Sequence, residues 1–150
     1  MNLYCMALDA TVLSSVGEDY LEQIYQLIEA KGYARAVEIA TKLEVSQASV
    51  SAMVQRLAAE GFIHYERYRG ITLTDAGRKA AQKIIQRHEV LTRLFAYFGL
   101  DEELIYRDVE GMEHHISPQT LQVLTLLTEE LEGNPQMLAR LKRRLRQRKE

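Results

Sequence analysis

The stretch that decides the fold is residues 36–74, AVEIATKLEVSQASVSAMVQRLAAEGFIHYERYRGITLT. Apolar residues recur in its first part at helical spacing and predict two helices, over about 35–43 and 46–60. Only Glu44 and Val45 separate these helices, and so short a turn makes them cross steeply. The pattern therefore indicates a helix-turn-helix.

A β-hairpin is predicted directly after the second helix, with strands over 62–65 and 70–73. The turn between the strands carries Arg67 and Arg69, whose guanidinium groups could reach phosphates or an adjacent minor groove. The alternative interpretation is a solvated turn. Helix, turn, helix and basic hairpin, in that order, predict a winged helix-turn-helix that binds DNA.

The outward face of the second helix is built from small and amide side chains. Long acidic side chains there would be repelled by phosphates, whereas glutamine can pair with adenine edges, serine with either base, and alanine can touch a thymine methyl group. Together with the hairpin arginines, the residues predicted to contact DNA are Ser46, Gln47, Ala48, Ser51, Gln55, Arg67 and Arg69.

Further helices are predicted on both sides of this segment. One precedes it and ends at Gly32, and a long one begins after Thr74 and continues to about Phe98. Asp101 and Ser117 are N-cap candidates for two more, the first of which is expected to end near residue 115. The expected fold class is mainly α with a small β-hairpin: a winged helix-turn-helix followed by an all-helical dimerisation domain.

The predicted domains are 14–82, which would bind DNA, and 83–150, a helical metal-binding and dimerisation domain. The chain after residue 84 has more apolar surface than a few helices can bury alone. We therefore expect a helical interface between two copies, and hence a homodimer.

Composition is that of an ordinary soluble protein, with 150 residues that are 47% hydrophobic and 27% charged. No run approaches the roughly 18 apolar residues needed to span a bilayer, and the N-terminus lacks the pattern of a signal peptide. These features predict a cytoplasmic protein without a membrane partner. Cys5 is the single cysteine and can form no internal disulfide.

The net charge of −2 hides a strong asymmetry along the chain. Residues 33–83 have eight basic against five acidic side chains, whereas residues 84–138 have three against ten. The basic middle suits phosphate contacts, and bound cations would partly neutralise the acidic part. The alternative is that both are merely solvated faces.

Six residues in short clusters are candidate ligands for a hard or borderline divalent cation: Asp19, Glu22, His88, Glu110, Glu113 and His114. On a helical wheel the first two share a face, and the last three fall within an arc of roughly 100°. Taken alone, His88 would read as an amphipathic surface histidine, and His115 lies off the proposed site. Carboxylates and imidazoles without thiolates suit Mn²⁺ or Fe²⁺ better than structural zinc.

Three motifs carry a resemblance to a known family: EDYLEQIYQLIEAKGYARAVEIA at 18–40, YERYRGITLT at 65–74 and DVEGMEHH at 108–115. They resemble the MntR branch of the iron- and manganese-dependent repressors related to the diphtheria toxin repressor. The resemblance covers roughly residues 18–135. It implies a homodimeric transcriptional repressor that binds operator DNA when loaded with Mn²⁺ and controls manganese uptake genes.

The resemblance also implies a site. The family's metal ligands fall on the same six residues and would hold two Mn²⁺ ions per subunit, with carboxylates shared between them. The iron-responsive relatives have methionine where this chain has Asp19, and they have a third, SH3-like domain. The hard oxygen of Asp19 therefore argues for manganese over iron.

Two other classes stay open as alternatives. A helical di-metal carboxylate enzyme needs a Glu-x-x-His pair on two helices, and Glu110 is followed at that spacing by Glu113, so we expect no enzyme. A winged-helix regulator that answers to a small organic ligand, or to iron, is the second alternative. A regulator of the small-ligand type would bind its operator equally well after chelation of metal.

Overall fold

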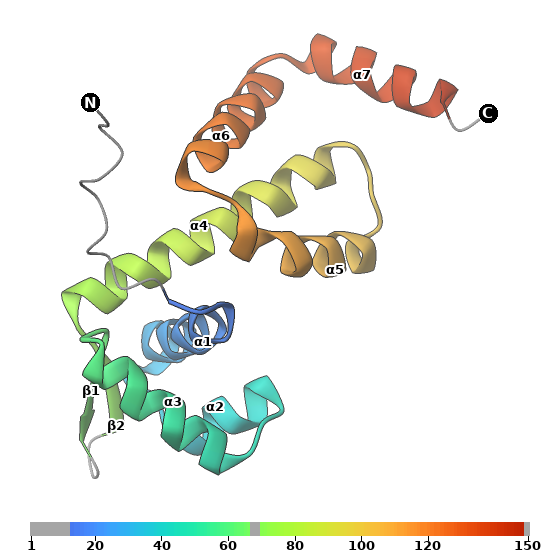
Figure 1. The fold of residues 1–150 in the computed structure, drawn as a ribbon. Helices are drawn as coiled ribbons and strands as arrows, with labels where there is room; N and C mark the ends of the chain where they lie inside the picture. Colours follow the sequence, from blue (N-terminus) through green and yellow to red (C-terminus); the bar gives the residue numbers. More distant parts are fainter. Residues whose placement is uncertain (1–12, 67–69, 149–150) are drawn as a thin grey trace, which may run out of the picture. The chain divides into compact units, whose positions relative to one another are not determined.

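The computed structural model describes residues 13–66 and 70–148. The chain separates into two compact units, Met1–Ile84 and Ile85–Glu150, and each is described by itself. The elements, labelled in Figure 1, are α1 (Ser15–Lys31), α2 (Ala36–Leu43), α3 (Gln47–Ala59), β1 (Ile63–Glu66), β2 (Gly70–Leu73), α4 (Asp75–Tyr97), α5 (Glu102–Met112), the 3₁₀ turn η1 (Glu113–His115), α6 (Pro118–Gly133) and α7 (Pro135–Gln147).

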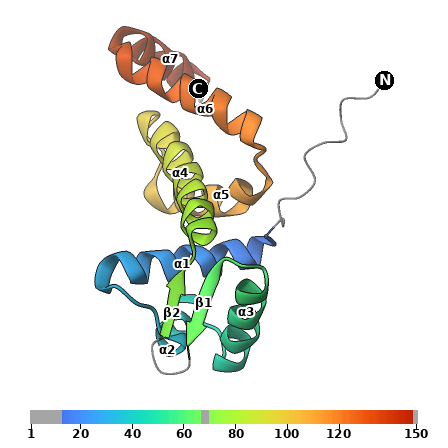
Figure 2. The same ribbon diagram turned by 90° about the vertical axis from the view of Figure 1, so that its left-hand side faces the viewer.

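The first unit confirms the helix-turn-helix and its hairpin. The turn between α2 and α3 places Glu44 in the left-handed region, at φ 54°, and Ser46 caps α3 by accepting a hydrogen bond from the Ser49 N–H at 3.1 Å. β1 and β2 pair antiparallel, with Ile63 opposite Leu73, and the hairpin lies beside α3 (Figure 2). Mainly helical structure with one small hairpin is the predicted fold class.

One hydrophobic core holds the first unit together. α1, α2, α3 and β2 each contribute fully buried aliphatic side chains to it: Leu21, Ile24, Ile39, Val50, Leu57 and Ile71. A short bridge from Ala34 to Ile71 ties the loop after α1 to the hairpin. Because α1 and α3 share this core, a displacement of α1 would be felt by α3.

The start of α4 is fitted closely to the hairpin. The Thr74 hydroxyl accepts a hydrogen bond from the Gly77 N–H at 3.0 Å and lies 2.7 Å from the Gly61 carbonyl oxygen, to which it can donate. A Cβ atom at Gly77 would lie 1.8 Å from the Phe62 carbonyl oxygen. Only glycine therefore permits this approach of helix to hairpin.

The second unit has a smaller core. Leu91 of α4 packs with Ile105 and Val109 of α5, and Phe95 and Leu124 are partly buried against them. Asp101 and Ser117 cap α5 and α6 as predicted, accepting hydrogen bonds from backbone N–H groups of the first turn. Two more helices, α6 and α7, complete the second unit.

Two details differ from the sequence expectation. α5 ends at Met112, and the next three residues form a single 3₁₀ turn where a continuous helix to about residue 115 was expected. The first strand begins at Ile63 and ends at Glu66, one residue later than predicted. No helix of the described residues is long and apolar enough to cross a bilayer.

Candidate metal centre and DNA-facing helix

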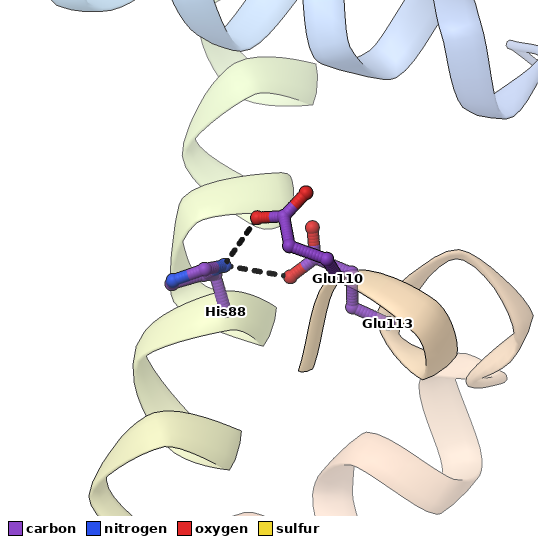
Figure 3. Close-up of side chains that lie close together, drawn as sticks. All are labelled: His88, Glu110 and Glu113. Carbon is purple, nitrogen blue, oxygen red and sulfur yellow. Dashed lines mark hydrogen bonds and ion pairs between the residues drawn. The ribbon is translucent and has the colours of Figure 1, made fainter. Parts of the chain in front are cut away.

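His88, Glu110 and Glu113 come together in the second unit (Figure 3). The Nδ1 atom of His88 lies 2.9 Å from Oε2 of Glu113 and 3.7 Å from Oε1 of Glu110. One ligand atom from each residue lies within 4.8 Å of the other two. Three of the six predicted ligands therefore share one site.

The core beside the site explains this convergence. Leu91, one turn after His88 on α4, is buried with Val109 of α5, which directly precedes Glu110. This packing holds α4 and α5 together so that Glu110, the residue after Val109, faces His88. The 3₁₀ turn then directs Glu113 inward, where it is 1% exposed.

The chemistry of the three side chains fits a hard or borderline divalent cation. A carboxylate as buried as that of Glu113 is strongly desolvated, which is costly for a charge unless a partner compensates it. Glu110 brings a second carboxylate, whose side chain is 41% exposed, to the same imidazole nitrogen. Two carboxylates and one imidazole, without a thiolate, are the donors that Mn²⁺ and Fe²⁺ accept readily.

His114 lies at the edge of this cluster. Its Nε2 atom is 3.9 Å from Oε1 of Glu113, and its side chain is mostly buried, whereas His115 is exposed. This agrees with the expectation that His114 belongs to the site side of the turn and that His115 does not. Whether His114 is a ligand stays a prediction.

Asp19 and Glu22 belong to α1, in the first unit, and both are half-buried. Oε1 of Glu22 accepts a hydrogen bond from Nε2 of Gln26, one turn further along α1, at 2.9 Å. One helical turn separates the two carboxylates, which gives them a common face. Their participation in the same metal centre stays a prediction.

The face of α3 predicted to contact DNA is exposed. Gln47, Ala48, Ser51 and Gln55 are all on the surface, while Val50, Val54 and Leu57 are buried. The Ser51 hydroxyl donates to the Gln47 carbonyl oxygen at 2.9 Å, and Ser46 caps the helix. Arg67 and Arg69 lie outside the described residues, so the prediction for the hairpin tip is untested.

Sequence reasoning missed a charged cluster between α1 and α2. The Tyr33 ring has the Lys31 ammonium group 5.0 Å and the Arg35 guanidinium group 5.1 Å from its centre. Glu38 is paired with Lys31 and accepts a hydrogen bond from the Arg35 N–H, and the Lys31 contact, first among the causes, lowers the pKa of the Glu38 carboxyl. The sequence carries no signal for this cluster, because Lys31 ends α1 and each member alone resembles an ordinary surface residue.

A winged helix-turn-helix joined to a helical unit with a carboxylate–imidazole cluster is the architecture of a metal-dependent DNA-binding regulator. Residues 12–71 match the family described as iron dependent repressor, N-terminal DNA binding domain. Residues 74–141 match iron dependent repressor, metal binding and dimerisation domain.

Similar curated proteins identify the branch of this family to which the chain belongs. The HTH-type transcriptional regulator MntR of Lysinibacillus sphaericus is 47% identical over 124 residues, 83% of this chain and 89% of that protein. MntR of Bacillus subtilis is 52% identical over 100 residues, 67% of this chain and 70% of that protein. The chain belongs to the MntR family of HTH-type transcriptional regulators, within the iron dependent repressors.

Solved structures agree with this assignment. The manganese regulator SloR superposes with a TM-score of 0.67 at 28% identity, over 75% of this chain and 53% of its own. This chain thus spans about half the length of that structure. The family makes the protein a DNA-binding regulator.

Proposed function

We propose that this protein is a manganese-responsive repressor that binds operator DNA as a homodimer and controls manganese uptake genes. The observation that carries the proposal is the cluster of His88, Glu110 and Glu113, a hard oxygen and nitrogen site in a family of DNA-binding regulators. The name of the similar protein SloR, a manganese regulator, supports the choice of metal. Such a regulator acts in the cytoplasm, where its operator lies.

The proposed ligands are His88, Glu110, Glu113 and His114 of the helical domain, together with Asp19 and Glu22 of the DNA-binding domain. The helical domain is taken as residues 83–150 and the DNA-binding domain as residues 14–82. Two Mn²⁺ ions per subunit would use all six side chains. When bound, Mn²⁺ supplies positive charge that compensates the clustered carboxylates and ties them together.

The carboxylates control the regulator through their mutual repulsion. Glu110 and Glu113 both approach one imidazole nitrogen, and like charges held this close destabilise each other until they are compensated. Asp19 and Glu22 lie on α1, whose Leu21 shares a core with Leu57 of α3. Fixing α1 therefore fixes the recognition helix, and the populations shift toward the form that binds DNA.

DNA recognition is assigned to α3 and the hairpin. Gln47, Ala48, Ser51 and Gln55 would face base edges, and the N-cap Ser46 would lie near the backbone. Arg67 and Arg69 would contact phosphates. In a dimer, two such helices would read half-sites one or more DNA turns apart.

The test is a gel-shift titration with DNA ligands selected from a random pool in parallel by the Mn²⁺-loaded, the Fe²⁺-loaded and the metal-free protein. We expect a shift with Mn²⁺ that disappears on chelation. A shift that survives chelation would identify a small-ligand regulator. A shift with Fe²⁺ under anoxic conditions but none with Mn²⁺ would identify an iron-responsive one.

A further inference from the structure

The last helix, α7, has no buried residue. Its partly buried apolar stripe, made by Leu138, Leu141 and the more exposed Leu145, runs along one side. An isolated helix of this length is marginal in water, so its stability depends on packing. The packing available within the second unit leaves this stripe incompletely covered.

A trough lies between α7 and the turn from α4 to α5. The larger cavity in it has a volume of about 450 Å³ and is lined by Phe98, Leu100, Leu141, Arg144, Leu145 and Arg148. A second cavity of about 280 Å³ shares Phe98 and Leu145 and adds Lys142 and Arg146. The floor of the trough is apolar and its rim is cationic.

No carboxylate neutralises this rim within residues 13–66 and 70–148. The cations on the rim, Lys142, Arg144, Arg146 and Arg148, form no ion pair within 4.0 Å there. An occupant of the trough must therefore present apolar and anionic groups together. DNA offers only the anionic part.

The outer face of α6 has the complementary character. Val123 and Leu126 are 64% and 62% exposed, and Leu127 is also exposed. On a helical wheel Glu130 falls in the same arc of roughly 100° as these three, at its C-terminal end. Among the described residues, Glu130 likewise has no cation within 4.0 Å.

The two faces match in spacing as well as in charge. Val123, Leu127 and Glu130 stand at positions i, i+4 and i+7 of α6. Leu141 and Leu145 of α7 and its C-cap residue Arg148 have the same spacing. Both patterns span about 10.5 Å and end in a charge, and the charges are opposite.

We propose that α6 of a second copy of this chain seats in the α7 trough, parallel to α7, with its Glu130 beside Arg148. An antiparallel arrangement would instead place Glu130 against Leu141, so the charges specify the direction. In a two-fold dimer the contact occurs twice, because each copy supplies one α6 and one α7. The inference rests on the proposed homodimer and names the faces that build it.

The experiment exchanges the two charges between copies. Full-length Glu130→Arg and Arg148→Glu chains are each studied alone and as an equal mixture, by sedimentation and by energy transfer between labelled chains, without DNA. Each variant alone would place like charges together twice, and we expect dimer dissociation about tenfold easier than for the parent. In the mixed dimer both contacts again join opposite charges, and affinity returns to within about twofold of the parent.

Two controls sharpen the result. Arg143→Glu makes the same charge change on the opposite side of α7 and should leave the dimer unchanged, whereas Leu127→Asp should weaken it more than the tenfold expected of a charge reversal.

A mixture that stays as weak as its components would overturn the proposal, as would variants that dimerise like the parent. Should Arg148→Glu reduce only DNA affinity, or binding of a fatty acid used as probe, α7 has another partner and the proposal is equally wrong.

The outcome is separable from the proposed function. Mn²⁺ binding by each variant is measured in parallel, and these substitutions lie outside the metal cluster. If the variants bind Mn²⁺ normally but the mixture does not regain affinity, only the proposed interface is refuted. If DNA binding by the parent protein does not depend on Mn²⁺, the proposed function is refuted, and the dimer assay can still be interpreted.

Discussion

Glu113 holds a carboxylate in a position that solvent scarcely reaches, 2.9 Å from the imidazole of His88. At the scale of single residues, we propose that this side chain decides whether the cluster can hold a divalent cation. Burying an isolated carboxylate costs much free energy, because its charge is removed from water without a partner that compensates it. The metal response should therefore be more sensitive to Glu113 than to the half-exposed Glu110 beside it.

Replacing Glu113 with glutamine tests this directly. Glu113→Gln keeps the size of the side chain and removes its charge, so Mn²⁺ affinity, measured by titration calorimetry, should fall about a hundredfold or more. Circular dichroism should show an unchanged fold without metal, because the change removes a desolvated charge. Glu103→Gln, on the exposed first turn of α5, serves as the control and should bind Mn²⁺ normally. A fully responsive Glu113→Gln protein would refute the site.

Glu38 offers a pH test at the same scale. Lys31 is the main cause that lowers the pKa of this carboxyl below its ordinary value of 4.5. A lowered pKa stabilises the fold above the ordinary value, and that contribution disappears as pH falls through the folded-state pKa. The melting temperature of the parent should therefore exceed that of Glu38→Gln at neutral pH, and the two should converge in acid. Glu129→Gln, at an exposed site on α6, controls for the removal of one acidic charge, and a constant gap for Glu38→Gln would contradict the assignment.

Among the elements, the junction of the hairpin with α4 is expected to tolerate a larger side chain least. Gly77→Ala would place a methyl group on the Phe62 carbonyl oxygen, and we expect a loss of about 1–3 kcal/mol or more in the free energy of unfolding. Gly111→Ala is the matched control, since nothing lies within 4 Å of a Cβ there and the helix should gain about 0.5–1 kcal/mol. Urea denaturation measures both. Equal stabilities for the two variants would show that the close approach relaxes at no cost.

α3 and the hairpin are expected to contact DNA differently, α3 at base edges and the hairpin at phosphates. Gln55→Ala should change base preference, as read from selected sequences, because the variant has no amide to pair with a base edge. Arg67→Ala should instead weaken binding to all sequences and flatten the salt dependence by about one unit for each phosphate that is no longer neutralised. Unchanged affinity and unchanged salt slope for Arg67→Ala would show that the hairpin does not touch DNA.

The elements also show what the sequence can and cannot predict. The helix-turn-helix followed from apolar spacing and from Ser46, and the caps Asp101 and Ser117 appear where expected, because these signals are local. The 3₁₀ turn after Met112 was missed, because no proline or capping residue in the sequence marks the end of α5 at that point. The close approach at Gly77 was also invisible, because it depends on a distant carbonyl.

The site was predictable only in part for the same reason. A helical wheel can place Glu110, Glu113 and His114 on one side of a segment, and in the structure the two glutamates lie beside His88. The distance between separate helices is set by the core around Leu91, which no periodicity reveals. The cluster around the Tyr33 ring could not be predicted, because each of its members reads alone as a surface residue.

At the scale of the whole molecule, the central claim is that the metal centre and the operator-binding surface are coupled. Such coupling must be reciprocal: the factor by which Mn²⁺ tightens operator binding equals the factor by which operator tightens Mn²⁺ binding. The most direct measurement pairs fluorescence anisotropy of labelled operator, with Mn²⁺ and with chelator, and calorimetry of Mn²⁺ with and without operator. We predict equal factors of at least about tenfold. An operator affinity that is the same with Mn²⁺ and with chelator, or a Mn²⁺ affinity that is the same with and without operator, would contradict the coupling.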